Sequence, residues 1–125
     1  KTNPIVKARE LSEIIEKAVP SIYARGRIHP ATKTFQAIRM TVNDEINSLI
    51  FGLRGAWKKL SSGGRLAVVS FHEGEDRIVK NFFNFLKKNG QAIVLTKKPI
   101  TPSRTEVVAN PRSRSAKLRI IEKKA

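Results

Sequence analysis

The sequence predicts an α/β protein in which helices pack on a small sheet. Three observations lead to this fold class. Apolar residues recur at helical spacing through the first 60 residues, a short apolar run follows a Gly-Gly turn at 63–64, and helical and strand-like patterns then alternate. The expected order is helix, long helix, strand, helix, strand, strand. A strand, a helix and another strand in succession indicate a right-handed crossover in a layered sheet.

The composition narrows the class of protein. A chain of 125 residues, 40% hydrophobic and 28% charged, is typical of a globular protein with one modest core. With no cysteine, disulfides, thiolate metal sites and cysteine nucleophiles are excluded. No apolar run approaches the roughly 18 residues of a membrane span, and the first residues lack the apolar core of a signal peptide. We therefore expect a cytoplasmic protein without a membrane partner.

The charge is strongly positive and unevenly spread. The net charge is +15, and residues 77–125 hold 13 basic and two acidic residues. A field of this sign attracts polyanions, of which nucleic acid and anionic membrane are the main candidates. The cations lie largely in segments containing Pro and Ser rather than on one face of an apolar helix, which favours nucleic acid.

Two helices are expected in the first half. The first covers 3–19, with Thr2 or Asn3 as its cap, Pro4 at its first position and Pro20 ending it. After a basic connection over 21–31, apolar residues at three- and four-residue spacing predict one long helix over 32–60.

That long helix contains Gly52 and Gly55. Each glycine costs a helix interior about 1 kcal/mol relative to alanine, so we expect a kink or a close packing contact there.

The second half contains the strands. An apolar run predicts a strand over 66–71 that is covered on both faces, and β-rich runs predict two more over 92–96 and 117–122. A helix is expected over 75–89, and a Ser-x-x-Glu capping box at 103–106 predicts one short helical turn. Three strands make a thin sheet, and the apolar first strand would leave an edge open for pairing.

Residues 27–39 form the first candidate functional segment, at the entry to the long helix. In the structural interpretation Thr32 or Thr34 caps the helix and Arg39 is solvated. In the functional one the helix N-terminus binds phosphate. The polar residues that would then contact RNA are Arg27, His29, Thr32, Lys33, Thr34, Gln36 and Arg39.

The second candidate segment is 70–77, where the first strand runs into a helix. Ligands of open α/β sheets bind beyond the carboxyl ends of strands, and His72, Glu75 and Asp76 place three titratable groups there, next to Arg77. The alternative is that the acids only complement the positive end of the helix. No metal site is expected, because the two histidines are far apart and lack carboxylates at ligand spacing.

The third candidate segment is 110–119, where Arg and Ser alternate before the last strand. Guanidinium and hydroxyl groups suit RNA phosphates, which indicates RNA contacts from Asn110, Arg112, Arg114 and Lys117. A solvated loop is the alternative. The chain has no Walker loop, nucleophile elbow or Gly-x-Gly-x-Gly loop after a strand.

The same segments resemble the MraW family of ribosomal RNA small subunit methyltransferases. The matching stretches are HPATKTFQAIR at 29–39 with VNDE at 42–45, GGRL at 63–66, SFH at 70–72, EDRIVK at 75–80, and NPRSRSAKLR at 110–119. The resemblance covers nearly all of the chain. It implies an S-adenosylmethionine-dependent enzyme that methylates the N4 amine of a cytidine in small-subunit ribosomal RNA.

The resemblance also implies an architecture. The chain would be the C-terminal half of a class I, Rossmann-like methyltransferase sheet ending in antiparallel strands (41–125), preceded by part of a helical, substrate-recognising insert (1–40). His72, Glu75 and Asp76 become the catalytic candidates, as acceptor or orienter of the amine. Asn43, Ser70, Phe71 and Arg77 join the RNA-contacting set, Phe71 by stacking on the base.

Two features depart from the family pattern. Glu73-Gly74 replaces Ser-Leu, and the adenosylmethionine-binding half has no counterpart here, so no cofactor-binding residue can be assigned. We expect either a portion of a longer protein or a degenerate gene product. The partner would be small-subunit rRNA or the assembled subunit.

Two other functional classes remain open. One is a non-catalytic, basic, ribosome-associated RNA-binding module. The other is a structural fragment whose strand edge pairs with a second copy or with the missing N-terminal half.

Overall fold

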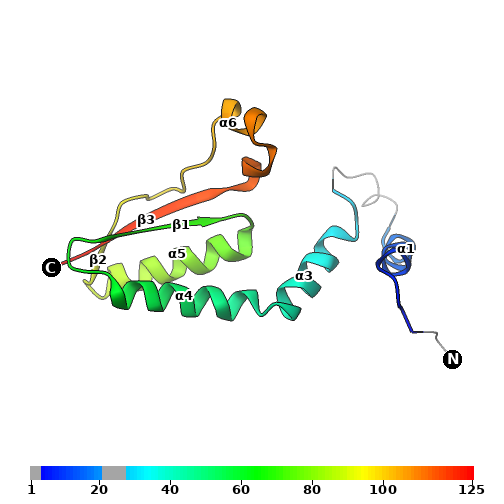
Figure 1. Ribbon diagram of the computed structural model, residues 1–125, viewed down its shortest axis with the longest axis horizontal. Coiled ribbons are helices and arrows are strands. Elements are labelled where there is room, and N and C mark those ends of the chain that lie inside the picture. Colours follow the sequence, from blue (N-terminus) through cyan, green and yellow to red (C-terminus); the bar gives the residue numbers. More distant parts are fainter. Residues whose placement is uncertain (1–3, 21–27) are drawn as a thin grey trace. The chain divides into compact units, whose positions relative to one another are not determined.

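The computed structural model describes residues 4–20 and 28–125 (Figure 1). The chain divides into two compact units, an N-terminal unit, Lys1–Glu45, and a C-terminal unit, Ile46–Ala125. No helix in the described ranges is both long and apolar enough to cross a bilayer.

The first helix of the N-terminal unit, α1 (Ala8–Ala18), begins later than its sequence pattern predicts. The Glu10 carboxylate accepts hydrogen bonds from the backbone N–H groups of Val6 and Lys7, at 3.1 and 3.3 Å. These bonds satisfy the amides of the two residues just before the helix, so Pro4 lies ahead of the helix instead of opening it. The predicted caps Thr2 and Asn3 lie outside the described residues. Pro20 follows the helix end, as expected.

The predicted long helix is two helices, α3 (Thr32–Val42) and α4 (Glu45–Lys59). The start at Thr32 is confirmed, but the cap position is Ala31, which makes no side-chain capping bond. The interruption lies at Asp44, whose φ of +49° is a left-handed conformation that Asp tolerates better than most residues. The sequence pattern did not reveal it, because helical spacing continues across the break.

The two helix glycines do not make the predicted close contact. A Cβ added at Gly52 or Gly55 would meet no described atom within 4 Å. Both lie on the exposed side of α4. The predicted close contact is therefore absent among the described residues, and both glycines lie within the α4 helix.

The C-terminal unit contains the sheet and its helices. Along the chain its elements after α4 are β1 (Arg65–Ser70), α5 (Glu73–Lys88), β2 (Ala92–Val94), α6 (Arg104–Ala109), the 3₁₀ helix η1 (Pro111–Ser115) and β3 (Lys117–Lys123). The predicted capping box is confirmed in part, since the Ser103 hydroxyl accepts the Glu106 N–H at 3.1 Å. Most boundaries fall within two residues of those expected.

The three strands form one sheet in the order β1-β3-β2. β3 is antiparallel to both neighbours, pairing Ser70 with Lys117 on one side and Ala92 with Lys123 on the other. β1 and β2 therefore run in the same direction, joined through α5, with the last strand between them. The α/β class is confirmed at this level of mixed helices and a small sheet.

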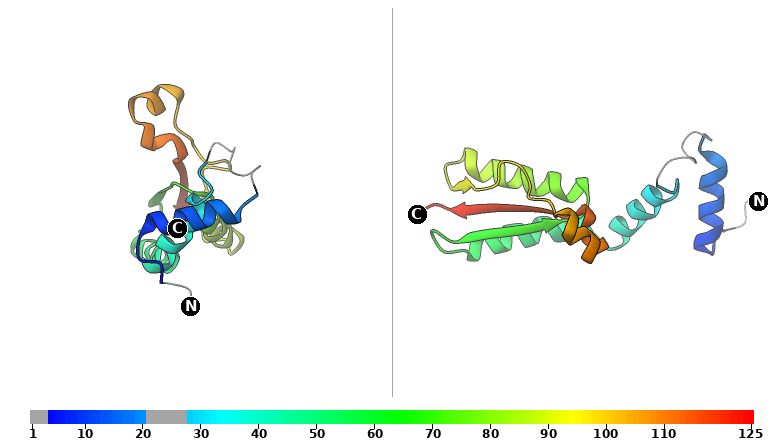
Figure 2. Two further views of the ribbon diagram at one scale, coloured as in Figure 1. Left: turned by 90° about the vertical axis from the view of Figure 1, so that its right-hand side faces the viewer. Right: turned by 90° about the horizontal axis from the view of Figure 1, so that it is seen from above.

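Helices α4 and α5 cover the same face of the sheet (Figures 1 and 2). The buried core on that face consists of Leu53, Val79, Phe83, Leu86, Ala92 and Ile121. On the opposite face Val69 is 53% and Ile93 46% exposed. The prediction that the first strand is covered on both faces is thus wrong for the described chain, because both helices pack on one side.

Strand β1 is also an edge strand. Within the described residues it pairs with β3 alone. Its other edge presents unpaired backbone groups, as the apolar pattern had suggested.

Candidate functional site

The turn from β1 into α5 gathers most of the second candidate segment. Ser70 is buried at the end of the strand, and its hydroxyl lies 3.5 Å from the Lys117 carbonyl oxygen. Phe71 comes next, with 55% of its surface exposed. Glu73, Glu75 and Asp76 then occupy the first turn of α5, where the helix dipole favours negative charge.

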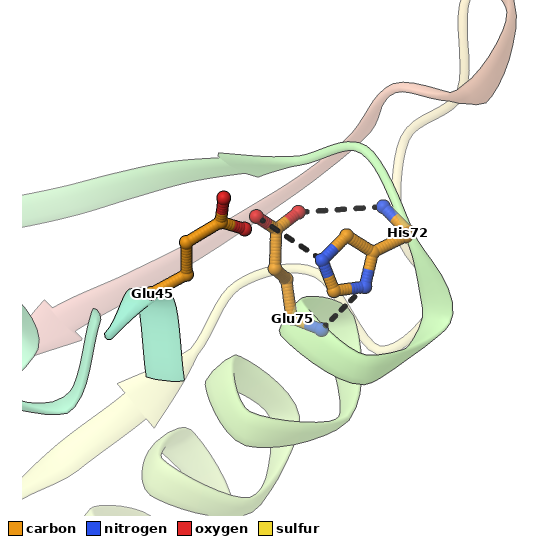
Figure 3. Close-up of side chains that lie close together, drawn as sticks. All are labelled: Glu45, His72 and Glu75. Atoms are coloured by element: carbon orange, nitrogen blue, oxygen red, sulfur yellow. Dashed lines mark hydrogen bonds and ion pairs between the residues drawn. The ribbon is translucent and has the colours of Figure 1, made fainter. Parts of the chain in front are cut away.

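His72 caps α5 and is locked to Glu75 by reciprocal bonds (Figure 3). Its Nδ1 accepts the backbone N–H of Glu75 at 3.3 Å. In return Oε2 of Glu75 accepts the backbone N–H groups of His72, at 3.3 Å, and of Phe71, at 2.9 Å. The turn owes its shape to this capping box.

These bonds fix the orientation of the His72 ring relative to Glu75. Since Nδ1 accepts an amide hydrogen, the neutral ring carries its own hydrogen on Nε2. That Nε2 is buried, has no hydrogen-bond partner among the described residues, and lies 3.4 Å from Oε1 of Glu75. In this arrangement both ring nitrogens face Glu75, which suits His72 to orienting that residue.

Asp76 is engaged by an arginine from the middle strand. Its two carboxylate oxygens accept Nε and Nη2 of Arg119 at 2.6 and 2.9 Å. Only 6% of Asp76 and 7% of Arg119 is exposed. A bidentate pair of this kind is strong and geometrically specific, and it ties the first turn of α5 to β3.

The pair changes the proton affinity of the carboxyl group. Hydrogen bonds from Arg119 lower the pKa of Asp76 below its ordinary value of 3.8, against the opposing effect of burial. Asp76 is therefore a weak base, with both oxygens occupied. Its geometry suits a positioning residue better than a proton acceptor.

Sequence reasoning had not singled out Arg119. An arginine between Leu118 and Ile120 in an apolar strand is a usable signal, because a buried arginine requires a paired acid. A second contact ties the same two elements, since Lys117 Nζ pairs with Glu73. Lys117, expected to contact RNA, thus has an acidic neighbour from α5.

The third candidate segment is largely helical. Asn110 precedes η1, which carries Arg112 and Arg114, and all three are exposed. The buried Ser113 donates its hydroxyl hydrogen to the Asn110 carbonyl at 2.8 Å, which fixes the turn. Because η1 leads directly into Lys117, opposite Ser70, the second and third segments adjoin at one end of the sheet.

The first candidate segment belongs to the N-terminal unit. His29 accepts the Ala31 N–H at Nδ1, at 3.2 Å, and its Nε2 lies 2.6 Å from Glu16. Arg39 pairs with Glu45 at 2.8 Å, and Asn43 donates to the same carboxylate at 3.3 Å. Of the other predicted RNA-contacting residues, Thr32, Lys33, Thr34 and Arg77 are exposed, Gln36 is half-buried, and Arg27 lies outside the described residues.

The side chains present do not make up an adenosylmethionine site. The 125 residues contain no Gly-x-Gly-x-Gly loop after a strand. β1 instead passes directly into the capped first turn of α5.

Comparison with known proteins places the chain in a family. The model of the MraW methylase family matches residues 1–124. Proteins named ribosomal RNA small subunit methyltransferase H are similar to this chain: that of Trichormus variabilis is 52% identical over 98% of the chain, and that of Persephonella marina 48% over 98%. The match covers 39% and 42% of those two proteins, so the chain spans about two fifths of their length. The chain belongs to the MraW methylase family.

Proposed function

We propose that this chain is part of an enzyme that methylates small-subunit ribosomal RNA, transferring a methyl group from S-adenosylmethionine to the N4 amine of a cytidine. The observation that carries the proposal is identity of about one half, across nearly the whole chain, to proteins named for rRNA methylation. The charge of +15 supports an RNA partner, either free rRNA or the assembled subunit. We place the activity in the cytoplasm.

The fold proposed for the longer protein is the class I, Rossmann-like sheet. The supporting feature is the sheet order, in which antiparallel β3 lies between β1 and β2, two strands of the same direction joined by α5. The resemblance predicted antiparallel final strands at this end of the sheet. We infer that the open edge of β1 pairs with the preceding half of such a sheet.

We further propose that two parts of the chain have different roles. Residues 1–40 would belong to the substrate-recognising insert, and 41–125 to the methyltransferase domain. RNA would be contacted from both parts, including the exposed side chains Lys33, Arg77, Arg112 and Arg114.

The chemistry requires an acceptor for the amine hydrogen. The N4 lone pair of cytosine is delocalised into the ring, so attack on a methyl group is assisted when a nearby acceptor polarises the N–H bond. Among the three catalytic candidates, Glu75 is the best placed. Its Oε2 accepts two backbone amides, whereas Oε1 is engaged less strongly, by the 3.4 Å approach of His72 Nε2.

The other residues of the turn would position this acceptor. His72 holds the backbone of Glu75, and Asp76 anchors the same helical turn to Arg119. Phe71 is exposed just before them and would stack on the target base. Correct placement of the amine contributes a large part of the rate in such transfers.

Replacement of the proposed acceptor tests this mechanism. In the longer protein, Glu75→Gln should lower kcat by about 100-fold or more with little change in RNA affinity, as expected for a lost proton acceptor. Asp76→Asn should also reduce turnover far more than RNA affinity, because the helical turn that carries Glu75 loses its ion pair with Arg119 and holds Glu75 less firmly. Arg54→Gln, a change in an exposed residue of α4, serves as the control. Equal losses of turnover and RNA affinity in either variant would refute the assignment.

The competing function is a non-catalytic RNA-binding module, which the charge alone would support. It predicts steeply salt-dependent RNA binding by the longer protein and no methyl transfer. The same assay separates the two functions.

A further inference from the structure

A basic groove lies between α5 and the segment that follows β2, and of its lining residues only Arg119 belongs to one of the three candidate segments. Its volume is about 170 Å³. Its polar lining consists of Lys80, Asn84, Lys87, Thr96, Lys97 and Arg119.

The polar lining of the groove comes from one helix face and one loop. Lys80, Asn84 and Lys87 are spaced by four and three residues on α5, so they share a face. All three are exposed, as is Lys97 across the groove. Lys80 and Lys87 are separated by about 10 Å along the helix axis, which is about three nucleotide steps of a helical nucleic acid strand.

Lys80, Lys87 and Lys97 form no ion pair with an acid in the described part of the chain. No acid lines the groove. Asp76, on the same helix, is already paired with Arg119, and Glu122, on β3, with Arg65 at 2.8 Å. The groove therefore presents about three uncompensated positive charges to a ligand.

The groove also offers neutral donors on an apolar floor. Thr96 Oγ1 accepts the Ile120 N–H at 2.9 Å, which fixes the oxygen and leaves the hydroxyl hydrogen free to donate. The Asn84 amide supplies two further donors. Phe83, 1% exposed, and Val94 form the floor, and the low dielectric of this apolar surface strengthens electrostatic interactions of the nearby charges.

We propose that this groove binds phosphate groups of the RNA backbone. Lysine ammonium groups and the Thr and Asn donors match phosphate oxygens, and such contacts fix the RNA without reading its sequence. The inference rests on the proposed function, since it takes RNA as the partner. It extends the RNA contacts from the end of the sheet along the outer face of α5.

A pair of charge-matched triple variants tests the groove. The groove variant is Lys80→Ala/Lys87→Ala/Lys97→Ala. The control is Lys58→Ala/Lys88→Ala/Lys98→Ala, which removes three exposed lysines that do not line the groove. The probe is a fluorescent 20-nucleotide polyuridine RNA, and its anisotropy is measured with the longer protein at several salt concentrations.

The groove variant should bind the RNA about tenfold more weakly than the wild type at 0.1 M salt. The slope of log affinity against log salt concentration should become shallower by about 2, because each lost phosphate contact to single-stranded RNA removes about 0.7 from that slope. The control should lose less than threefold and keep its slope. Equal losses in the two variants would overturn the groove proposal but leave RNA binding intact. No RNA binding by the wild-type longer protein would instead count against the proposed RNA partner itself.

A second experiment tests whether the groove binds RNA or a small phosphorylated ligand. Inorganic phosphate is titrated while the NMR signal of the Asn84 side-chain amide is followed. A phosphate-induced shift together with the selective RNA loss supports the proposal. A shift without that loss would assign the groove to a free phosphorylated molecule and overturn the RNA assignment.

Discussion

At the scale of single residues, the Asp76–Arg119 pair is the strongest determinant of the site. Both side chains are over nine-tenths buried, so each charge requires the other. The pair fixes the α5 turn that carries Glu75 against the middle strand. A buried ion pair next to proposed reacting groups provides rigidity as well as stability.

Removal of one partner should be costly. Asp76→Asn leaves the buried guanidinium without its counter-charge and should lower the free energy of unfolding by about 3–5 kcal/mol. Adding Arg119→Met should restore much of this loss, because it removes the unpaired charge. Guanidinium chloride unfolding measures both variants. A double variant no more stable than Asp76→Asn would contradict a direct pairwise interaction.

The same pair predicts acid sensitivity with a definite sign. The folded-state pKa of Asp76 lies below its ordinary value of 3.8, so the unfolded chain takes up the proton first as the pH falls. The stabilising contribution is present above about pH 3.8 and is lost as the pH falls through the lowered folded-state pKa. Unfolding free energies measured from pH 6 downward should decline less steeply below this point in Asp76→Asn than in the wild type. Parallel curves would show that Asp76 does not contribute.

At the scale of elements, local patterns predicted which segments are helices and strands, but not their long-range contacts. Helical spacing extended across Asp44 because a break of two residues leaves the apolar period almost intact. The apolar run of β1 predicted a strand but not which face would be covered, since that depends on α4 and α5.

For the candidate site too, the sequence predicted the local elements but not the long-range contacts. The strand-to-helix turn with His72, Glu75 and Asp76 could be located from local order alone. Its tie to Arg119, 43 residues away in the sequence, could not be located, because it depends on the register of β3.

The exposed glycines of α4 give a prediction for that element. Gly52→Ala and Gly55→Ala should each stabilise the chain by up to about 1 kcal/mol, since alanine is the better helix former and neither Cβ meets a described atom. Thermal unfolding monitored by circular dichroism measures the change, and Gly63→Ala, at a φ of +74°, is the destabilising control. A loss of stability at Gly52 or Gly55 would mean that their freedom is needed elsewhere in the chain.

At the scale of the whole molecule, the chain combines a one-sided sheet with a dense positive charge. Helices α4 and α5 cover one face of the sheet, β1 pairs with β3 alone among the described strands, and residues 77–125 hold 13 of the 25 basic residues. These features fit a chain that needs further protein on one side and polyanionic RNA on another. They support its proposed place in an rRNA methyltransferase.

The most direct test of this account is to identify the product. The longer protein is incubated with small ribosomal subunits and S-adenosylmethionine labelled in its methyl group, and the RNA is digested to nucleosides and analysed by mass spectrometry. The account predicts label in N4-methylcytidine, strongly reduced by Glu75→Gln. Label in a different nucleoside, or none despite intact RNA binding, would contradict it.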